Sequence, residues 1–244
     1  PTEAPLPEGT GAAIAQLAEA AGAHWTDVLA ALTGAYVARH LASVASGAAS
    51  DVVLGIPLQN RMGRVARTPS TQVNVLPLHL VIDETAPLAD WLRGAAARLA
   101  AMRRNSRYRG EALQRELGRI GAGRRLWGPL VNILPFDACP SLSGCDTRLQ
   151  ILGAGSVDDI TFCFRGAPGA GLLVQVDGND ARYTAAETAA HGARLAQFLA
   201  QAVTGRTLAE VPTLTPAETE ATTLTRNATA QPVPRTTLTA LIEA

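Results

Sequence analysis

The chain contains no lysine, few cysteines and no long apolar run. All 21 of its basic residues are arginine, which excludes a Schiff-base lysine, a phosphate-loop lysine and a lysine general base. No stretch of roughly 18 consecutive apolar residues occurs, so no transmembrane helix is expected. The segment Pro1–Pro5 lacks the basic patch and apolar stretch of a signal peptide. We therefore expect a cytoplasmic location.

Cysteine and histidine are too sparse and too scattered to suggest a metal site. The three cysteines, Cys139, Cys145 and Cys163, include no Cys-x-x-Cys pair, so ordinary reduced thiols are expected. The four histidines lie far apart in the sequence, whereas zinc ligands are closely spaced. His79, at the end of an apolar strand, is the one histidine that we place near a site.

Charge is distributed unevenly along a chain whose formal net charge is zero. Residues 98–125 hold nine arginines against two acids, Glu111 and Glu116. Such a segment attracts an anionic partner, although a solvated helical face explains the pattern equally well. Aromatic residues make up 4% of the chain, and few of them interleave with the arginines, which argues against a nucleic-acid partner.

The spacing of apolar residues predicts an α+β fold, with one mixed β-sheet covered by helices. Thr10, Thr26 and Thr184 are predicted helix caps. The apolar run 72–82 is predicted to be a strand buried on both faces. Helices are expected over residues 10–22, 26–41, 87–104, 110–118 and 184–205, and strands over residues 51–58, 72–82, 129–136, 148–152, 160–165 and 172–176.

The composition changes after Pro212, where threonine and proline become frequent. Residues 222–234 have the composition of a linker, and residues 238–244 are expected to begin another element. We therefore divide the chain into residues 1–212, a folded lobe, and residues 213–244, a linker.

Six stretches, taken in order, carry a resemblance to one family. The first is Asp-Val-Val-Leu-Gly-Ile-Pro-Leu-Gln-Asn-Arg at 51–61, similar to "dvvvGxPxxxR". The others are 71–78 (similar to "GxFVNTxPLR"), 104–111 ("HQDYPFE"), 125–132 ("NPLFxxxxN"), 155–162 ("fDLtl", in its siderophore-synthetase variant) and 224–238, which resembles the lead into an adenylation domain. Together they resemble the second half of nonribosomal peptide synthetase condensation domains. The departures are Val75 in place of threonine, Asn105 in place of histidine, and the missing Gly-Phe before Asn74.

This resemblance implies a chloramphenicol acetyltransferase-like lobe, one of the two that form a V-shaped condensation domain. The family's HHxxxDG motif belongs to the N-terminal lobe, and this chain has no adjacent histidine pair. The chain therefore resembles the C-terminal, acceptor-side lobe and is expected to be inactive alone. An intact domain would join a carrier-bound acyl or peptidyl thioester to a carrier-bound aminoacyl group through an amide bond. No catalytic residue is expected in this chain.

The resemblance also implies partners and supporting residues. Arg61 matches the arginine that pairs with the aspartate of HHxxxDG, and Asn74 and Asn132 match positions near the catalytic histidine. The alternatives are a solvated loop arginine and asparagines that satisfy backbone groups at strand ends. Arg103, Arg104, Arg107 and Arg109 are expected to contact a carrier protein or its phosphopantetheine arm. No cofactor is expected to bind directly, and the expected partners are the N-terminal lobe, donor and acceptor peptidyl carrier proteins and an adenylation domain.

Two other functions remain open from the sequence. The first is a noncatalytic platform that docks carrier proteins and holds the adenylation domain. The second is an epimerisation domain, which shares the fold. The adenylation-like lead after Pro212 argues against the second, because epimerisation domains usually follow a carrier rather than precede an adenylation domain.

Overall fold

The computed structural model describes residues 2–41, 50–61, 63–119, 126–136, 142–147, 151, 155–231 and 237–243. The chain divides into two compact units, Pro1–Thr213 and Leu214–Ala244. We describe each unit by itself.

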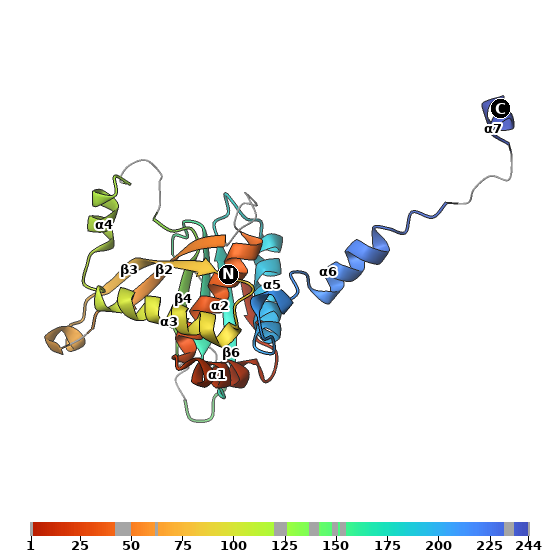
Figure 1. Cartoon of the computed structure of the whole chain (residues 1–244). Coiled ribbons are helices and arrows are strands. Elements are labelled where there is room, and N and C mark those ends of the chain that lie inside the picture. Colours follow the sequence, from red (N-terminus) through yellow and green to blue (C-terminus); the bar gives the residue numbers. More distant parts are fainter. Residues whose placement is uncertain are drawn as a thin grey trace. The chain divides into compact units, whose positions relative to one another are not determined.

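The first unit is built on a mixed six-stranded sheet in the order β1-β6-β5-β4-β2-β3 (Figure 1). The strand β4 runs parallel to both of its neighbours, β2 and β5, and the other pairs are antiparallel. The strands are β1 (Thr2–Pro5), β2 (Ser50–Gln59), β3 (Val73–Ile82), β4 (Leu130–Leu134), β5 (Ile160–Gly166) and β6 (Leu172–Gly178). The predicted α+β class with a mixed sheet is confirmed.

Helices cover the sheet and close the core. The helix α2 (Trp25–His40) is buried from Asp27 through Ala38 and contacts β2, β3 and β4 as well as its helical neighbours. Around it pack α1 (Thr10–Ala21), α3 (Leu88–Arg104) and α5 (Ala185–Ala202), while the short α4 (Gly110–Glu116) contacts β3. Buried side chains of α2, α5 and the sheet, among them Tyr36, Phe162 and Phe164, form one apolar cluster.

Three local predictions are wrong. Gly9 rather than Thr10 caps α1, and the cap of α2 is His24, whose ring accepts a hydrogen bond from the Thr26 amide. The strand β3 is not buried on both faces but lies at the edge of the sheet, with Val73 51% exposed. An apolar run alone does not reveal whether a strand has one neighbour or two. By contrast, Thr184 caps α5 through a complete capping box, as predicted.

Two segments differ from the sequence-based expectation in another way. The strand β1 was not predicted, because Thr2–Pro5 is too short to carry a clear alternation of apolar residues. The predicted strand over residues 148–152 lies, except for Ile151, outside the described residues, as does Cys139.

The second unit consists of short helical segments with exposed side chains. A capping box between Thr215 and Glu218 starts α6 (Pro216–Glu220), which continues into a π-helical turn over Ala221–Thr225. The first residues of the predicted linker, 222–225, are therefore helical. The helix α7 (Leu238–Ile242) lies where a further element was expected. Across the described residues, no helix is both long and apolar enough to cross a membrane.

A buried histidine links α2 to α5. Nδ1 of His191 is 2.8 Å from the Tyr36 hydroxyl, and the ring is 8% exposed. Burial lowers the pKa of His191 below its ordinary value of 6.5, with Arg194 and His40 acting in the same direction and Glu187 against it. The folded protein therefore holds this ring neutral where the unfolded chain binds a proton.

We predict that the free energy of unfolding falls as the pH drops below about 6.5, because the unfolded state then takes up a proton that folded His191 refuses. Urea unfolding at pH 7.5 and pH 5.5 measures the change. His191→Asn, which keeps an acceptor for Tyr36, should flatten this part of the profile. A profile that is equally steep in His191→Asn contradicts the assignment.

Candidate functional site

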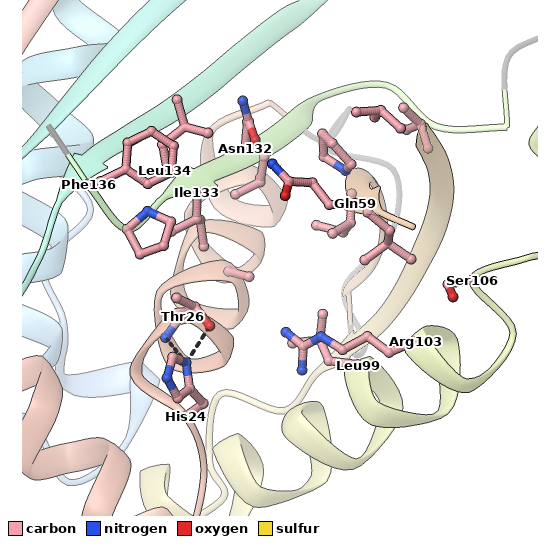
Figure 2. Close-up of a pocket in the computed structure, with 18 residues that line it drawn as sticks. His24, Thr26, Gln59, Leu99, Arg103, Ser106, Asn132, Ile133, Leu134 and Phe136 are labelled. Atoms are coloured by element: carbon pink, nitrogen blue, oxygen red, sulfur yellow. Dashed lines mark hydrogen bonds between the residues drawn. The ribbon is translucent and has the colours of Figure 1, made fainter. Parts of the chain in front are cut away.

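A cavity of about 820 Å³ opens between β2 and β4. Its walls come from the end of β2, the start of β3, β4, the N-terminal end of α2 and the C-terminal half of α3. Figure 2 shows Asn132, Ile133, Leu134 and Phe136 along the β4 side, with Leu99 and Arg103 of α3 across from them. His24 and Thr26 lie at the end formed by α2 (Figure 2).

The cavity exists because β2 and β4 part almost at once. They share one residue pair, Gly55 with Leu130, whereas β2 pairs with β3 over ten positions and β4 with β5 over five. Beyond that pair, residues 56–59 and 131–134 all line the cavity. A Cβ atom at position 55 would lie 2.5 Å from the ring of Trp127, so a larger residue would force that ring to move. The ring therefore packs on bare backbone where the strands diverge.

The lining is mostly apolar, with a few polar groups at separate points. Ile56, Leu58, Val75, Leu99 and Val131 supply much of the apolar surface. The polar groups belong to His24, Thr26, Gln59, Arg103, Ser106 and Asn132. Ligand cavities of this size usually combine an apolar wall with a few oriented polar groups. The arrangement suits a molecule with an apolar body whose polar end is oriented by hydrogen bonds.

His24, rather than His79, is the histidine at the cavity. Its Nδ1 lies 2.7 Å from the Thr26 hydroxyl and 3.4 Å from the Thr26 amide. His79 lies in the middle of β3, where its Nε2 is 3.3 Å from Asp51 and its side chain is 49% exposed. The expectation for His79 assumed that it ends a strand buried on both faces, whereas it lies within β3 with an exposed side chain and does not line the cavity. No sequence signal marked His24 beyond its place before a helix.

Asn132, which the resemblance matches to a position near the catalytic histidine, lies in the cavity wall. It sits opposite Cys163 in the β4–β5 ladder, and its Nδ2 donates to the Cys163 sulfur at 3.7 Å. Burial raises the pKa of the Cys163 thiol, which is therefore protonated near neutral pH. A thiol is a weak acceptor. Asn132 thus keeps most of its hydrogen-bonding capacity for a molecule in the cavity.

Arg103 lines the cavity but is already paired. Its Nη1 donates to Asp27 at 2.9 Å, and Nη2 forms a second, shorter contact with the other carboxylate oxygen. The hydrogen bond to Asp27 raises the pKa of Arg103. Asp27 is 6% exposed, so this ion pair joins α3 to α2 and offsets the arginine's charge.

Asn74 and Arg61 do not line the cavity, and both donate to backbone carbonyls. Asn74 donates to the carbonyls of Ser106 and Tyr108, at 2.8 and 2.7 Å. Arg61 donates to the carbonyls of Thr68 and Ser70, at 3.2 and 2.9 Å, within its own exposed loop. The structure thus brings Asn132 and Arg103 together at the cavity, but not Asn74 or Arg61.

The remaining predicted arginines form an exposed basic surface around the α3–α4 junction. Arg104, Arg107 and Arg109 are all exposed, as are Arg115 and Arg119. Among the described residues, none of the five has an ion pair. Arg124 and Arg125 lie outside the described residues. Within that same described part, no three His, Cys, Asp or Glu residues gather closely enough to hold a metal ion.

Solved structures define the class of protein to which this fold belongs. The first condensation domain of the CDA synthetase matches with a TM-score of 0.75 and 30% identity, over 88% of this chain and 46% of that one. VibH, a nonribosomal peptide synthetase condensation enzyme, matches with a TM-score of 0.69 and 28% identity, over 83% of this chain and 46% of that one. The fold is therefore that of a condensation domain, which confirms the expected chloramphenicol acetyltransferase-like class.

Curated relatives agree. A dimodular nonribosomal peptide synthase of Bacillus subtilis is 31% identical over 202 residues, and an isonitrile lipopeptide synthase of Streptomyces coeruleorubidus is 38% identical over 197. Enterobactin synthase component F of Escherichia coli K12 is 33% identical over 198 residues. No protein-family model matches the chain. The chain belongs to the condensation-domain family of nonribosomal peptide synthetases. Its similarity to a siderophore synthetase, enterobactin synthase component F, agrees with the sequence-based expectation.

The chain is much shorter than the proteins it matches. The alignments cover 82%, 78% and 79% of this chain, but 8%, 13% and 15% of those three relatives. It spans a little under half of the solved condensation domains.

We predict that the Asp27–Arg103 pair is asymmetric in its effect on stability. Arg103→Met leaves the buried carboxylate of Asp27 without its partner and should lower the free energy of unfolding by about 2 kcal/mol. Asp27→Ala leaves a half-exposed guanidinium that water can reach, so it should cost less, and the double variant should recover part of the loss. Arg93→Met, which breaks an exposed pair with Asp90 on the same helix, should cost under about 0.5 kcal/mol. Urea unfolding checks the series, and equal losses for both single variants would contradict it.

Proposed function

We propose that residues 1–212 are the C-terminal, acceptor-side lobe of a condensation domain. The observation that carries this proposal is the structural match itself, which spans most of this chain but 46% of the solved domain. The lobe would work with an N-terminal lobe that brings the HHxxxDG motif, and residues 213–244 would lead into an adenylation domain. The cytoplasmic location expected from the sequence remains a prediction.

In the proposed reaction, the amine of a carrier-bound aminoacyl group attacks the carbonyl carbon of a carrier-bound acyl or peptidyl thioester. A C–N bond forms and the C–S bond breaks. The donor's phosphopantetheine thiol leaves with the proton that the amine gives up. This lobe supplies positioning rather than acid–base chemistry, and positioning contributes much of the rate when two tethered groups must meet.

Each supporting residue has a proposed role consistent with its geometry. The cavity between β2 and β4 would hold part of an acyl or aminoacyl group, with Asn132 hydrogen-bonding to its polar end. Arg61 would pair with the aspartate of the N-terminal lobe's motif. Its two described bonds leave further N–H donors of the guanidinium available. Asn74 would act indirectly, by holding the segment that contains Ser106 and Tyr108. Without the N-terminal lobe, the chain would be inactive.

The exposed arginines give this proposal a docking surface. Carrier proteins are usually acidic and carry a phosphate on their pantetheine arm, so Arg104, Arg107 and Arg109 would attract them. Arg103 stays in the proposed set, with a smaller expected effect because Asp27 offsets its charge. Docking without catalysis is the second candidate function, and the same exposed surface supports it.

Amide formation by a protein extended at its N-terminus by about one domain length tests the main proposal. We expect amide product from loaded donor and acceptor carriers, and a loss of about 100-fold in Arg61→Gln. Glutamine keeps an N–H for the loop carbonyls but removes the charge. Arg67→Gln, in the same loop, is the matched control. A protein that binds carriers but condenses no pair overturns the catalytic proposal in favour of the platform.

A second experiment tests the docking surface. We predict that Arg104→Glu, Arg107→Glu and Arg109→Glu together raise the apparent KM for the carrier about tenfold at low salt, because like charges then face each other. The difference should shrink as salt screens the charges. Arg206→Glu, at a side chain 91% exposed elsewhere on the same unit, is the control. An unchanged KM would remove the carrier role from these arginines.

A further inference from the structure

Two asparagines fasten the segment between α3 and α4 to the sheet. The Nδ2 of Asn74 donates to the carbonyls of Ser106 and Tyr108, while its Oδ1 accepts from the Gly110 amide at 3.1 Å. The Nδ2 of Asn60, just after β2, donates to the same Ser106 carbonyl at 2.9 Å. One carbonyl therefore receives bonds from the ends of two adjacent strands.

The segment lies directly on the backbone of β3. A Cβ atom at Gly110 would come within 2.7 Å of the Val75 carbonyl oxygen, so only glycine fits where α4 begins. Ser106 is 8% exposed. Carbonyls that follow the last turn of a helix need partners from elsewhere, and here the two asparagine side chains supply them.

Asn74 fixes the backbone of this segment at three points, positions 106, 108 and 110. Ser106 and Gly110, at the two ends, are buried, whereas Arg107, Tyr108 and Arg109 between them are exposed. The bonds therefore hold a backbone arch against β3 from which the two arginines reach solvent.

The same segment is part of the cavity wall. Ser106 lines the cavity, and so do Val73 and Val75, which flank Asn74 in β3. Arg103, three residues earlier, is held by Asp27 of α2. A stretch of eight residues is thus fixed on both sides of the point where it meets the cavity.

We propose that Asn60 and Asn74 are positioning residues, which hold the basic segment 104–110 rigidly against the cavity wall and thereby set the affinity for an acidic carrier protein. The part concerning the carrier rests on the function proposed above. The rigidity of the segment does not. Removing either asparagine takes away one of the two hydrogen bonds to the Ser106 carbonyl, loosens the turn and lets Arg107 and Arg109 sample directions in which they no longer act together.

Trypsin tests the rigidity on the chain itself, since a chain without lysine is cut only after arginine. Asn74→Ala should speed cleavage after Arg104, Arg107 and Arg109 about tenfold, and Asn60→Ala should do so by less, because it removes fewer hydrogen bonds. Asn105→Ala is the matched control. Asn105 is exposed in the same segment and bonds to the Ala101 carbonyl of its own helix. If Asn60→Ala and Asn74→Ala are both cleaved no faster than Asn105→Ala, the proposal is overturned.

Carrier binding tests the consequence, with an acidic peptidyl carrier protein titrated against the N-terminally extended protein. Asn74→Asp keeps an acceptor for Gly110 but loses both donors, and it serves if Asn74→Ala fails to fold. We expect a roughly fivefold weaker Kd and a shallower dependence of Kd on salt, which a purely structural role would not produce. An unchanged Kd and salt dependence would overturn the link to the carrier. Neither trypsin cleavage nor carrier binding requires amide formation. A protein that binds the carrier but forms no amide would therefore overturn the catalytic function, while the two measurements would still test this proposal.

Discussion

The divergence of β2 and β4 after a single residue pair opens the cavity on which the proposed function depends. A sheet whose strands paired along their full length would bring residues 56–59 against residues 131–134 and leave no cavity. Here each strand keeps its outer neighbour, β3 or β5, so the backbone remains hydrogen-bonded while the gap opens. The ring of Trp127 against Gly55 occupies the point of divergence. The cavity thus opens where the two strands diverge and is completed by α2 and α3, while each strand stays paired on its other side.

The helix α2 forms one end of this cavity. Its N-terminal end reaches the opening, with His24 and Thr26 at the cavity, while its middle is packed in the core. The ion pair between Asp27 and Arg103 then ties α3 to this end of α2. The cavity therefore has walls that come from separate layers but are bonded to one another, so that its shape is a property of the whole unit.

Local patterns in the sequence predicted the elements well, and the site less well. The spacing of apolar residues correctly predicted α2, α3, α5 and five of the strands, because an element that buries one face repeats apolar residues within its own short segment. The pairing of strands is not local, so the edge position of β3 and the divergence at Gly55 could not be inferred. For the same reason His24 escaped notice and His79 was misplaced. The resemblance pointed to Asn132, which lies in the cavity wall, while its role there stays a prediction.

The fixed backbone of residues 106–110 has a thermodynamic consequence. A flexible loop of arginines must lose conformational entropy when a partner binds, and that loss opposes association. In this chain the backbone part of that loss has already occurred on folding, through the hydrogen bonds to Asn60 and Asn74. The proposed partner would then have to order only the arginine side chains, and a contact on such a fixed backbone would adapt poorly to partners of a different shape.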